Sequence, residues 1–221
     1  LVSNRLQKMT YPLLSADLFG SNWVQDIIRL TDQSFLFCTF GGLYRITEKN
    51  GKYDIQPFSF LNKKKYISFE AIYQDKGGTI YIKDLADGLY IMKPSEKQNG
   101  DTVIHSILFP PQINQFYTDT LSNSLLLATS MGLYRLNQND YSFKKIDFTP
   151  AVPFLSISSL MKTAGKLWLF GEKGLFCFDE KKNTARTFTV EDGLPANEFN
   201  LSANIFSSGE CIAGTTNGRE G

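Results

Sequence analysis

The sequence contains little of what metal-binding and hydrolytic sites are most often built from. Its 221 residues include one histidine, His105, and three cysteines, Cys38, Cys177 and Cys211. A single histidine can form neither a His-based metal cluster nor, without a placed serine and aspartate, a hydrolase triad. The cysteines lie far apart, each within an apolar run, which predicts buried thiols rather than a disulfide or a metal site. We therefore expect no metal and no cofactor.

The sequence also lacks an excess of charge of either sign. Its formal net charge is +1, which argues against a nucleic-acid partner. The one basic run, Lys63 to Lys65, stands beside Tyr66 and has two interpretations. It is either a solvated loop or a contact for an anion, such as an acidic glycan, a phosphate or an acidic protein surface. No charged-then-apolar leader begins the sequence, and no apolar run approaches the roughly twenty residues that span a bilayer, so we expect no membrane contact by this segment.

Aromatic residues and a repeat are what the sequence does contain. Aromatic residues make up 14%, with 17 glycines and 8 prolines scattered among them, which favours many short strands and turns. A hexapeptide with Gly, Leu and an aromatic residue occurs four times, as GGLYRI (41–46), DGLYIM (87–92), MGLYRL (131–136) and KGLFCF (173–178). This spacing is typical of the blades of a β-propeller.

Each repeat contains four strand-like segments in a fixed order, with a polar turn between the first two. The sequence therefore predicts an all-β propeller, a partial array of four to five four-stranded antiparallel blades within a larger ring. A closed five-bladed ring is the alternative, if an N-terminal strand completes the last blade. The predicted division of this single segment is an outer strand of a preceding blade (1–16), four blades (17–60, 61–108, 109–149 and 150–191) and the start of a truncated blade (192–221).

One further stretch, DGLPANEFN at residues 192–200, has an abbreviated counterpart near the N-terminus. Asp192 precedes Asn197 by the same interval as Asp17 precedes Asn22. Such a loop can join the outer strand of one blade to the inner strand of the next, with Gly193 and Pro195 fixing the turn. A direct ligand contact is the other interpretation of this loop.

Together the hexapeptides and the DGLPANEFN loop resemble the two-component regulator propeller repeats, which build the extracellular sensor region of bacterial hybrid two-component systems. The resemblance implies a non-enzymatic periplasmic sensor segment of an inner-membrane protein, with a histidine kinase elsewhere in the intact protein. It implies an oligosaccharide ligand, and the rest of the propeller or a second copy of the chain as partner. The alternatives are a glycan-active enzyme, a lyase or glycosidase without a named site, and a protein-binding scaffold.

The ligand is expected at one end of the blades. The crossovers between blades and the connections between second and third strands should share that end and gather around one mouth, opposite the small polar hairpin turns. Sugars are held by aromatic faces and a few fixed polar groups, so side chains of both kinds are the candidates. The alternative for any single aromatic residue at these positions is that it wedges between adjacent sheets. The candidate ligand-binding residues are Trp23, Lys63, Lys64, Tyr66, Asp87, Phe109, Gln112, Asn114, Phe154, Glu172 and Asn197. No catalytic residue is predicted.

Overall fold

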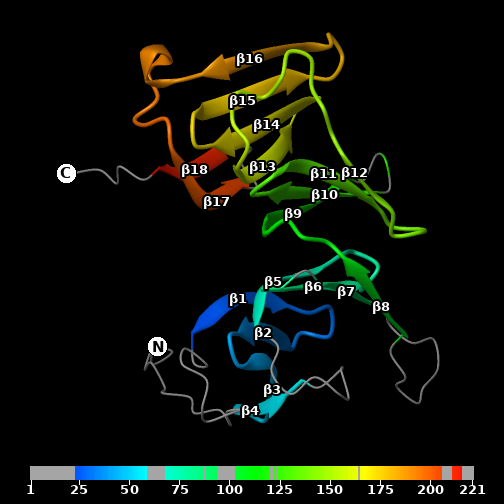
Figure 1. The fold of residues 1–221 in the computed structure, drawn as a ribbon. Helices are drawn as coiled ribbons and strands as arrows, with labels where there is room; N and C mark the ends of the chain where they lie inside the picture. Colours follow the sequence, from blue (N-terminus) through cyan, green and yellow to red (C-terminus); the bar gives the residue numbers. More distant parts are fainter. Residues whose placement is uncertain are drawn as a thin grey trace. The chain divides into compact units, whose positions relative to one another are not determined.

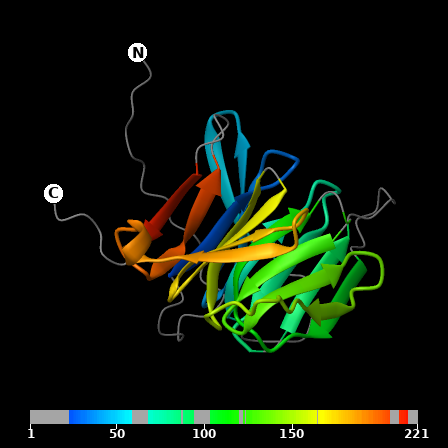
Figure 2. The same ribbon diagram turned by 90° about the horizontal axis from the view of Figure 1, so that it is seen from above.

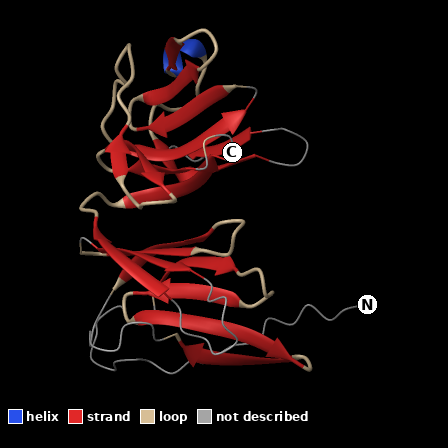
Figure 3. Cartoon of the chain, turned by 90° about the vertical axis from the view of Figure 1, so that its right-hand side faces the viewer, coloured by secondary structure: helices blue, strands red, loops and turns tan. Residues whose placement is uncertain are grey.

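The computed structural model describes residues 23–58, 68–86, 88–93, 103–119, 122, 124–163, 165–205 and 211–215. These residues form strands and connecting turns, apart from one short 3-10 helix (Figure 3). The all-β propeller prediction is thereby confirmed. In the part of the chain that is described, no helix has the length and apolar character to cross a membrane. The predicted outer strand in residues 1–16 lies outside the described residues.

The chain divides into two compact units, Leu1–Phe109 and Pro110–Gly221. The first unit contains two four-stranded antiparallel sheets, each with its strands in sequence order (Figure 1). The first sheet consists of β1 (Val24–Arg29), β2 (Phe35–Thr39), β3 (Gly42–Lys49) and β4 (Lys52–Pro57). The second sheet consists of β5 (Phe69–Gln74), β6 (Ile80–Asp84), β7 (Gly88–Lys93) and β8 (Val103–Leu108).

The second unit contains two more sheets of this kind and a two-stranded one. The third sheet consists of β9 (Ile113–Asp119), β10 (Ser124–Thr129), β11 (Gly132–Asn137) and β12 (Phe143–Lys145). The fourth consists of β13 (Ile157–Thr163), β14 (Lys166–Gly171), β15 (Gly174–Asp179) and β16 (Thr184–Phe188). The helix η1 (Val190–Asp192) follows β16 and leads to the fifth sheet, β17 (Phe199–Ile205) and β18 (Cys211–Thr215), which Figure 2 shows as the orange and red pair.

Consecutive sheets within a unit pack face to face, with their first strands adjacent: β1 lies against β5, β9 against β13, and β13 against β17. In the first unit the core between the sheets includes Leu36 and Leu43 of the first sheet with Ile82 and Tyr90 of the second. The third and fourth sheets bury an equivalent cluster that includes Leu133. Fully burying each such side chain contributes about 1.5–3 kcal/mol. The leucine of the repeated hexapeptide is therefore a core residue in the first three sheets, at Leu43, Leu89 and Leu133, whereas Leu175 in the fourth sheet is partly buried.

The glycine of the hexapeptide begins the third strand of each complete sheet. Gly42, Gly132 and Gly174 have φ angles of 141°, 115° and 118°, a region that residues with a Cβ rarely adopt. A Cβ on Gly174 would also lie 2.3 Å from the carbonyl oxygen of Phe188 in the neighbouring strand. Glycine is thus required at this position both by backbone conformation and by the close approach of β16.

Candidate functional site

Each complete sheet has two ends with different kinds of connection. The turn end carries the hairpins between first and second strands, such as residues 30–34, and between third and fourth strands. We call the opposite end the loop end. It carries the connections between second and third strands, at residues 40–41, 85–87, 130–131 and 172–173, together with the crossovers to the next sheet. The predicted ligand contacts that fall within the described residues belong to the loop end.

In the first unit one serine joins the loop ends of both sheets. Ser68 lies on the crossover just before β5, and its hydroxyl donates a hydrogen bond of 2.7 Å to the carbonyl oxygen of Phe40 in the β2–β3 connection. The carbonyl oxygen of Ser68 accepts a hydrogen bond of 2.8 Å from the amide of Leu85 in the β6–β7 connection. Two second-to-third-strand connections and a crossover therefore meet in this unit, as the repeat predicts.

Two large apolar side chains are exposed around this junction. Trp23 is 68% exposed and packs its ring edge-on against Phe40, with 6.0 Å between the ring centroids. Leu85 is 52% exposed. An exposed tryptophan held by a neighbouring ring offers the kind of flat apolar surface against which a sugar ring stacks. Among the sequence-predicted residues that the structure describes, Trp23 is the one that this junction presents to solvent.

The loop end of the second unit is assembled in the same way. The amide of Ser130 donates to the carbonyl oxygen of Gln112 at 3.1 Å, and the amide of Gly174 donates to the carbonyl oxygen of Asn197 at 2.6 Å. Each of these bonds ties a crossover to a second-to-third-strand connection. The side chains of Gln112 and Glu172 are exposed here. Within each unit the two kinds of connection meet, and the gathering of all of them around one common mouth stays a prediction.

Three residues of the DGLPANEFN loop, Asp192, Gly193 and Asn197, have structural roles. Thr189 caps η1 by accepting from the amide of Glu191, and the Asp192 carboxylate accepts from the amide of Thr189 at 3.0 Å and from Arg186 at 2.6 Å. These bonds hold the pKa of Asp192 below its ordinary value. Gly193 ends the helix in the left-handed conformation, with φ at 94°. The side-chain oxygen of Asn197 accepts from the amide of Val190 at 2.8 Å, so this candidate residue also braces its own loop.

Three candidate residues are used in packing. Phe109 has no exposed surface and Phe154 is 6% exposed, which corrects the expectation that these rings lie on the ligand-facing surface. A Cβ on Gly171 would lie 2.3 Å from the Phe154 ring, so the ring occupies space that glycine leaves between sheet and crossover. Asn114 donates from its side-chain amide to the carbonyl oxygen of Ile157 at 2.8 Å and thereby links the third sheet to the fourth.

The remaining candidates, Lys63, Lys64, Tyr66 and Asp87, lie outside the described residues. The loop-end residues that the sequence did not single out are Phe40, Ser68 and Leu85. The sequence did contain a feature that could have pointed to Leu85. The connection after β6 spans residues 85–87, whereas the corresponding connections of the other complete sheets have two residues each.

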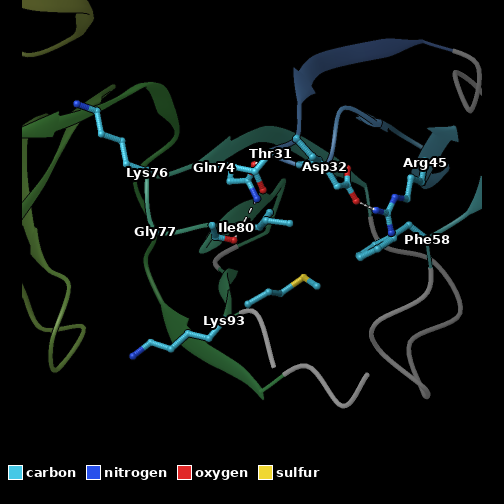
Figure 4. Close-up of a pocket in the computed structure, with 12 residues that line it drawn as sticks. Thr31, Asp32, Arg45, Phe58, Gln74, Lys76, Gly77, Ile80 and Lys93 are labelled. Atoms are coloured by element: carbon cyan, nitrogen blue, oxygen red, sulfur yellow. Dashed lines mark hydrogen bonds and ion pairs between the residues drawn. The ribbon is translucent and has the colours of Figure 1, made fainter. Parts of the chain in front are cut away.

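The turn end of the first unit contains a cleft of about 550 Å³ that the sequence did not predict (Figure 4). Asp32 and Arg45 point toward one another in one wall and form an ion pair, while Lys76 and Lys93 extend away from the centre. The side-chain oxygen of Gln74 accepts from the amide of Thr31 at 2.8 Å, and its nitrogen donates to Gly78 at 3.1 Å. Several polar groups of the cleft are thus engaged with other groups of the protein.

The equivalent seam in the second unit is filled by an aromatic side chain. Phe148 packs edge-on against Phe176 and Phe178 of the fourth sheet, with centroid separations of 5.5 and 5.2 Å. The cleft of Figure 4 lies on the corresponding seam between the first and second sheets. We therefore regard it as part of the packing between sheets and use its residues as controls for the loop end.

The described residues contain no group of three or more His, Cys, Asp or Glu side chains that could hold a metal ion. Cys38 and Cys177 are buried, as predicted, and desolvation raises the pKa of Cys38 to about 12. His105 lies on strand β8, the expected outer strand of the second sheet. Among the described residues, the loop ends present exposed aromatic, amide and carboxylate groups at Trp23, Gln112 and Glu172.

Solved structures with the same fold include an extracellular domain of a two-component system. The extracellular domain of the hybrid two component system BT3049 from B. thetaiotaomicron matches with a TM-score of 0.71 and 20% identity, over 88% of this chain and 27% of that one. PorZ, a surface component of the type IX secretion system of Porphyromonas gingivalis, matches with a TM-score of 0.65 and 12% identity, over 87% and 31%. The gluconolactonase XC5397 from Xanthomonas campestris matches with a TM-score of 0.60 and 13% identity, over 87% and 69%.

The chain therefore spans about a quarter of the length of the two-component system's extracellular domain and about a third of PorZ. No protein-family model matches the sequence, and no curated protein matches it either. At these identities the structural matches concern the fold alone. The resemblance to two-component sensor propellers, read from the hexapeptides and the DGLPANEFN loop, is confirmed at the level of the fold by an extracellular domain of such a system.

Proposed function

We propose that this chain is a non-catalytic, ligand-binding segment of the periplasmic sensor region of a two-component signalling protein, and that its ligand is a carbohydrate. The observation that carries the proposal is the fold match to the extracellular domain of a hybrid two-component system, at a TM-score of 0.71 over 88% of the chain. The histidine kinase belongs to another part of the intact protein under this proposal. The chain itself contributes recognition.

The chemistry of the loop end supports a carbohydrate as the ligand. Sugars present apolar C–H faces and many hydroxyl groups, and proteins hold them with aromatic rings and planar hydrogen-bonding side chains. The first unit offers the exposed ring of Trp23, while the second offers the exposed side chains of Gln112 and Glu172. Trp23 packs against Phe40, which a hydrogen bond ties to Ser68, and a backbone hydrogen bond ties Gln112 to Ser130, so binding at these groups would order few additional residues.

A glycan-active enzyme is the second candidate, because a gluconolactonase shares the fold. A protein-binding scaffold is the third, because PorZ, a secretion-system component, shares it as well. Fold alone does not separate the three functions. The three functions predict different outcomes with a sugar: a sensor binds it and leaves it unchanged, an enzyme converts it to a product, and a scaffold does not bind it.

The test is a panel of neutral hexose, pentose and uronic-acid oligosaccharides, four to six units long, read by thermal shift and by chromatography of the sugar afterwards. A ligand at one hundred times its dissociation constant stabilises the folded state by about 2.7 kcal/mol, a clear shift in melting temperature. We expect a shift with one sugar class and no product. Turnover of the sugar would establish the enzyme instead, and an unresponsive panel would refute the proposed carbohydrate ligand.

A further inference from the structure

The second sheet carries charged side chains where the other complete sheets are neutral. Lys83 pairs across the sheet with the leucine of the hexapeptide, Leu89. The residues at the same position in the other sheets, which pair with Leu43, Leu133 and Leu175, are Cys38, Ala128 and Phe170. Asp84 follows Lys83 in the sequence, where the other sheets have Thr39, Thr129 and Gly171.

A third charge stands nearby on the first strand. Glu70 lies at the irregularity between Phe69 and Ala71, where the pairing of β5 with β6 shifts. Ser158 occupies the same position in β13 and donates from its hydroxyl to the next sheet. A glutamate carboxylate cannot donate in this way. The second sheet therefore departs from the repeat at three positions, and all three departures are charged.

These three side chains form one buried cluster. Lys83 is 1% exposed, and its Nζ lies 3.9 Å from the Glu70 carboxylate and 3.8 Å from that of Asp84. The same Nζ donates hydrogen bonds of 2.6 Å to the carbonyl oxygen of Asp84 and 2.7 Å to that of Ala86. Asp84 in turn accepts from the amide of Gly88 at 2.8 Å and from the Tyr90 hydroxyl at 3.0 Å.

The hydrogen bonds of the cluster converge on the β6–β7 connection. In the first and third sheets a single threonine hydroxyl makes the side-chain hydrogen bond to the corresponding connection. The Thr39 hydroxyl accepts from the amide of Gly41 at 2.9 Å, and that of Thr129 accepts from the amide of Met131 at 3.0 Å. The β6–β7 connection is one residue longer than the others, and charged groups take the place of the hydroxyl.

Stability does not account for this replacement. Removing several charges from water is costly, and a buried ionic cluster is often no more stabilising than apolar residues of similar volume. The other sheets fold with cysteine, alanine or phenylalanine at the position of Lys83. Departures from a local rule concentrate at functional sites. The altered connection is also part of the loop-end junction, because the amide of Leu85 donates a hydrogen bond to the carbonyl oxygen of Ser68. The side chain of Leu85 is 52% exposed there.

We propose that Lys83, Asp84 and Glu70 are positioning residues that shape the β6–β7 connection, at Leu85 and Ala86, into a ligand-contacting element of the loop end. This inference rests on the proposed carbohydrate-binding function. Leu85 supplies an apolar contact on the same junction as Trp23, while the cluster beneath holds the backbone of the connection. Lys83 itself, being buried, touches no ligand.

The test replaces the connection by that of the third sheet. The graft combines Lys83→Ala, Asp84→Thr and Glu70→Asn with replacement of residues 85–87 by Ser-Met, the sequence at 130–131. Lys76→Ala, at the turn-end cleft, is the matched control. Binding is measured with the oligosaccharide that gives the largest thermal shift in the panel. We expect the graft to melt at or above the wild-type temperature and to bind at least tenfold more weakly, with the control unchanged. Wild-type affinity in a folded graft would overturn the inference.

Hydrogen exchange separates this inference from the proposed function. In Lys83→Met, without any sugar, the amides of Leu85 and Gly88 should exchange at least tenfold faster than in the wild type, while those of β1 keep their rates. Unchanged exchange would refute the positioning role even if a sugar binds. A panel without a ligand would refute the proposed function, and with it the assignment of Leu85 as a ligand contact. If the graft fails to fold, Lys83→Met with the same binding assay replaces it, with the same expected loss.

Discussion

Ser68 donates a hydrogen bond of 2.7 Å to the carbonyl oxygen of Phe40, 28 residues earlier in the chain, and so fastens a crossover to the connection of the preceding sheet. Phe40 in turn supports the exposed ring of Trp23. We expect Ser68→Ala to lower the free energy of unfolding by about 1 kcal/mol, the typical net value of one hydrogen bond. Ser68→Thr keeps the hydroxyl and should stay closer to the wild type. Equal urea midpoints for wild type and Ser68→Ala would show that this bond does not fasten the loop end.

The glycine of the hexapeptide provides a second test, because two glycines with similar φ angles differ in their surroundings. A Cβ on Gly174 would lie 2.3 Å from a backbone oxygen, whereas one on Gly193 meets nothing within 4 Å. Backbone strain alone costs about 1–3 kcal/mol. We expect Gly193→Ala to cost an amount in this range and Gly174→Ala clearly more, in chemical denaturation. Equal costs would contradict the close approach of β16.

Gln115 and Ser159 stand at equivalent positions of neighbouring sheets, but we expect their replacement by alanine to change the free energy of unfolding differently. The Gln115 side-chain oxygen accepts from the amide of Leu160 at 2.6 Å, linking the third sheet to the fourth. Ser159 stands at the same position one sheet later, fully buried, and its hydroxyl has no hydrogen-bond partner within the described residues. Gln115→Ala should lower the free energy of unfolding by about 1–3 kcal/mol by leaving an amide unpaired, whereas Ser159→Ala should leave it unchanged or raise it. Thermal melts of both variants measure these effects. A clearly lower melting temperature for Ser159→Ala than for Gln115→Ala would contradict the prediction and show that Ser159 stabilises the fold.

Asp26 links the first sheet to the second and gives a prediction about pH. Its carboxylate accepts from the amide of Ile72 at 3.0 Å, and desolvation raises its pKa above the ordinary value of 3.8. A carboxyl group whose pKa is higher in the folded state favours folding most below the unfolded pKa, and this contribution is lost as pH rises through the folded pKa. Asp26→Asn keeps an acceptor without the charge.

The stability of the wild type relative to Asp26→Asn should therefore fall as pH rises from below 3.8 toward neutrality. Taking the difference between the two proteins removes the contributions of other carboxyl groups, such as Asp32 and Asp179, whose pKa values are lowered. Urea titrations at several pH values measure this difference. A difference that rises with pH would mean that the hydrogen bonds to Asp26 outweigh its desolvation.

The strand order was predictable because the period and the alternation of apolar residues repeat in the sequence. Gly42, Gly132 and Gly174 mark the same place in three sheets, and their positive φ angles explain why the glycine recurs. Which aromatic side chains near the crossovers are buried and which are exposed was not predictable. Phe154 and Trp23 both stand near crossovers, but one is 6% and the other 68% exposed, since burial depends on neighbours distant in sequence, such as Gly171.

The Lys83 cluster could have been found from the sequence by aligning the repeats. The segment TIYIKD departs from FLFCTF and LLLATS by a Lys-Asp pair at the end of the second strand. The contacts of the Lys83 side chain could not be predicted from the sequence. Its ammonium group turns back to two carbonyl oxygens of the following connection, a contact that depends on the path of the backbone.

The central claim is that the loop end of this propeller segment binds a carbohydrate without converting it. The most direct measurement is titration of wild type, Trp23→Ala and Lys76→Ala with the oligosaccharide selected by the panel, using isothermal calorimetry and chromatography of the recovered sugar. Lys76 lines the turn-end cleft, whereas Trp23 stands at the loop end. We predict unaltered sugar, a folded Trp23→Ala with at least tenfold weaker binding, and wild-type binding by Lys76→Ala. Equal binding by Trp23→Ala, or loss confined to Lys76→Ala, would contradict the account.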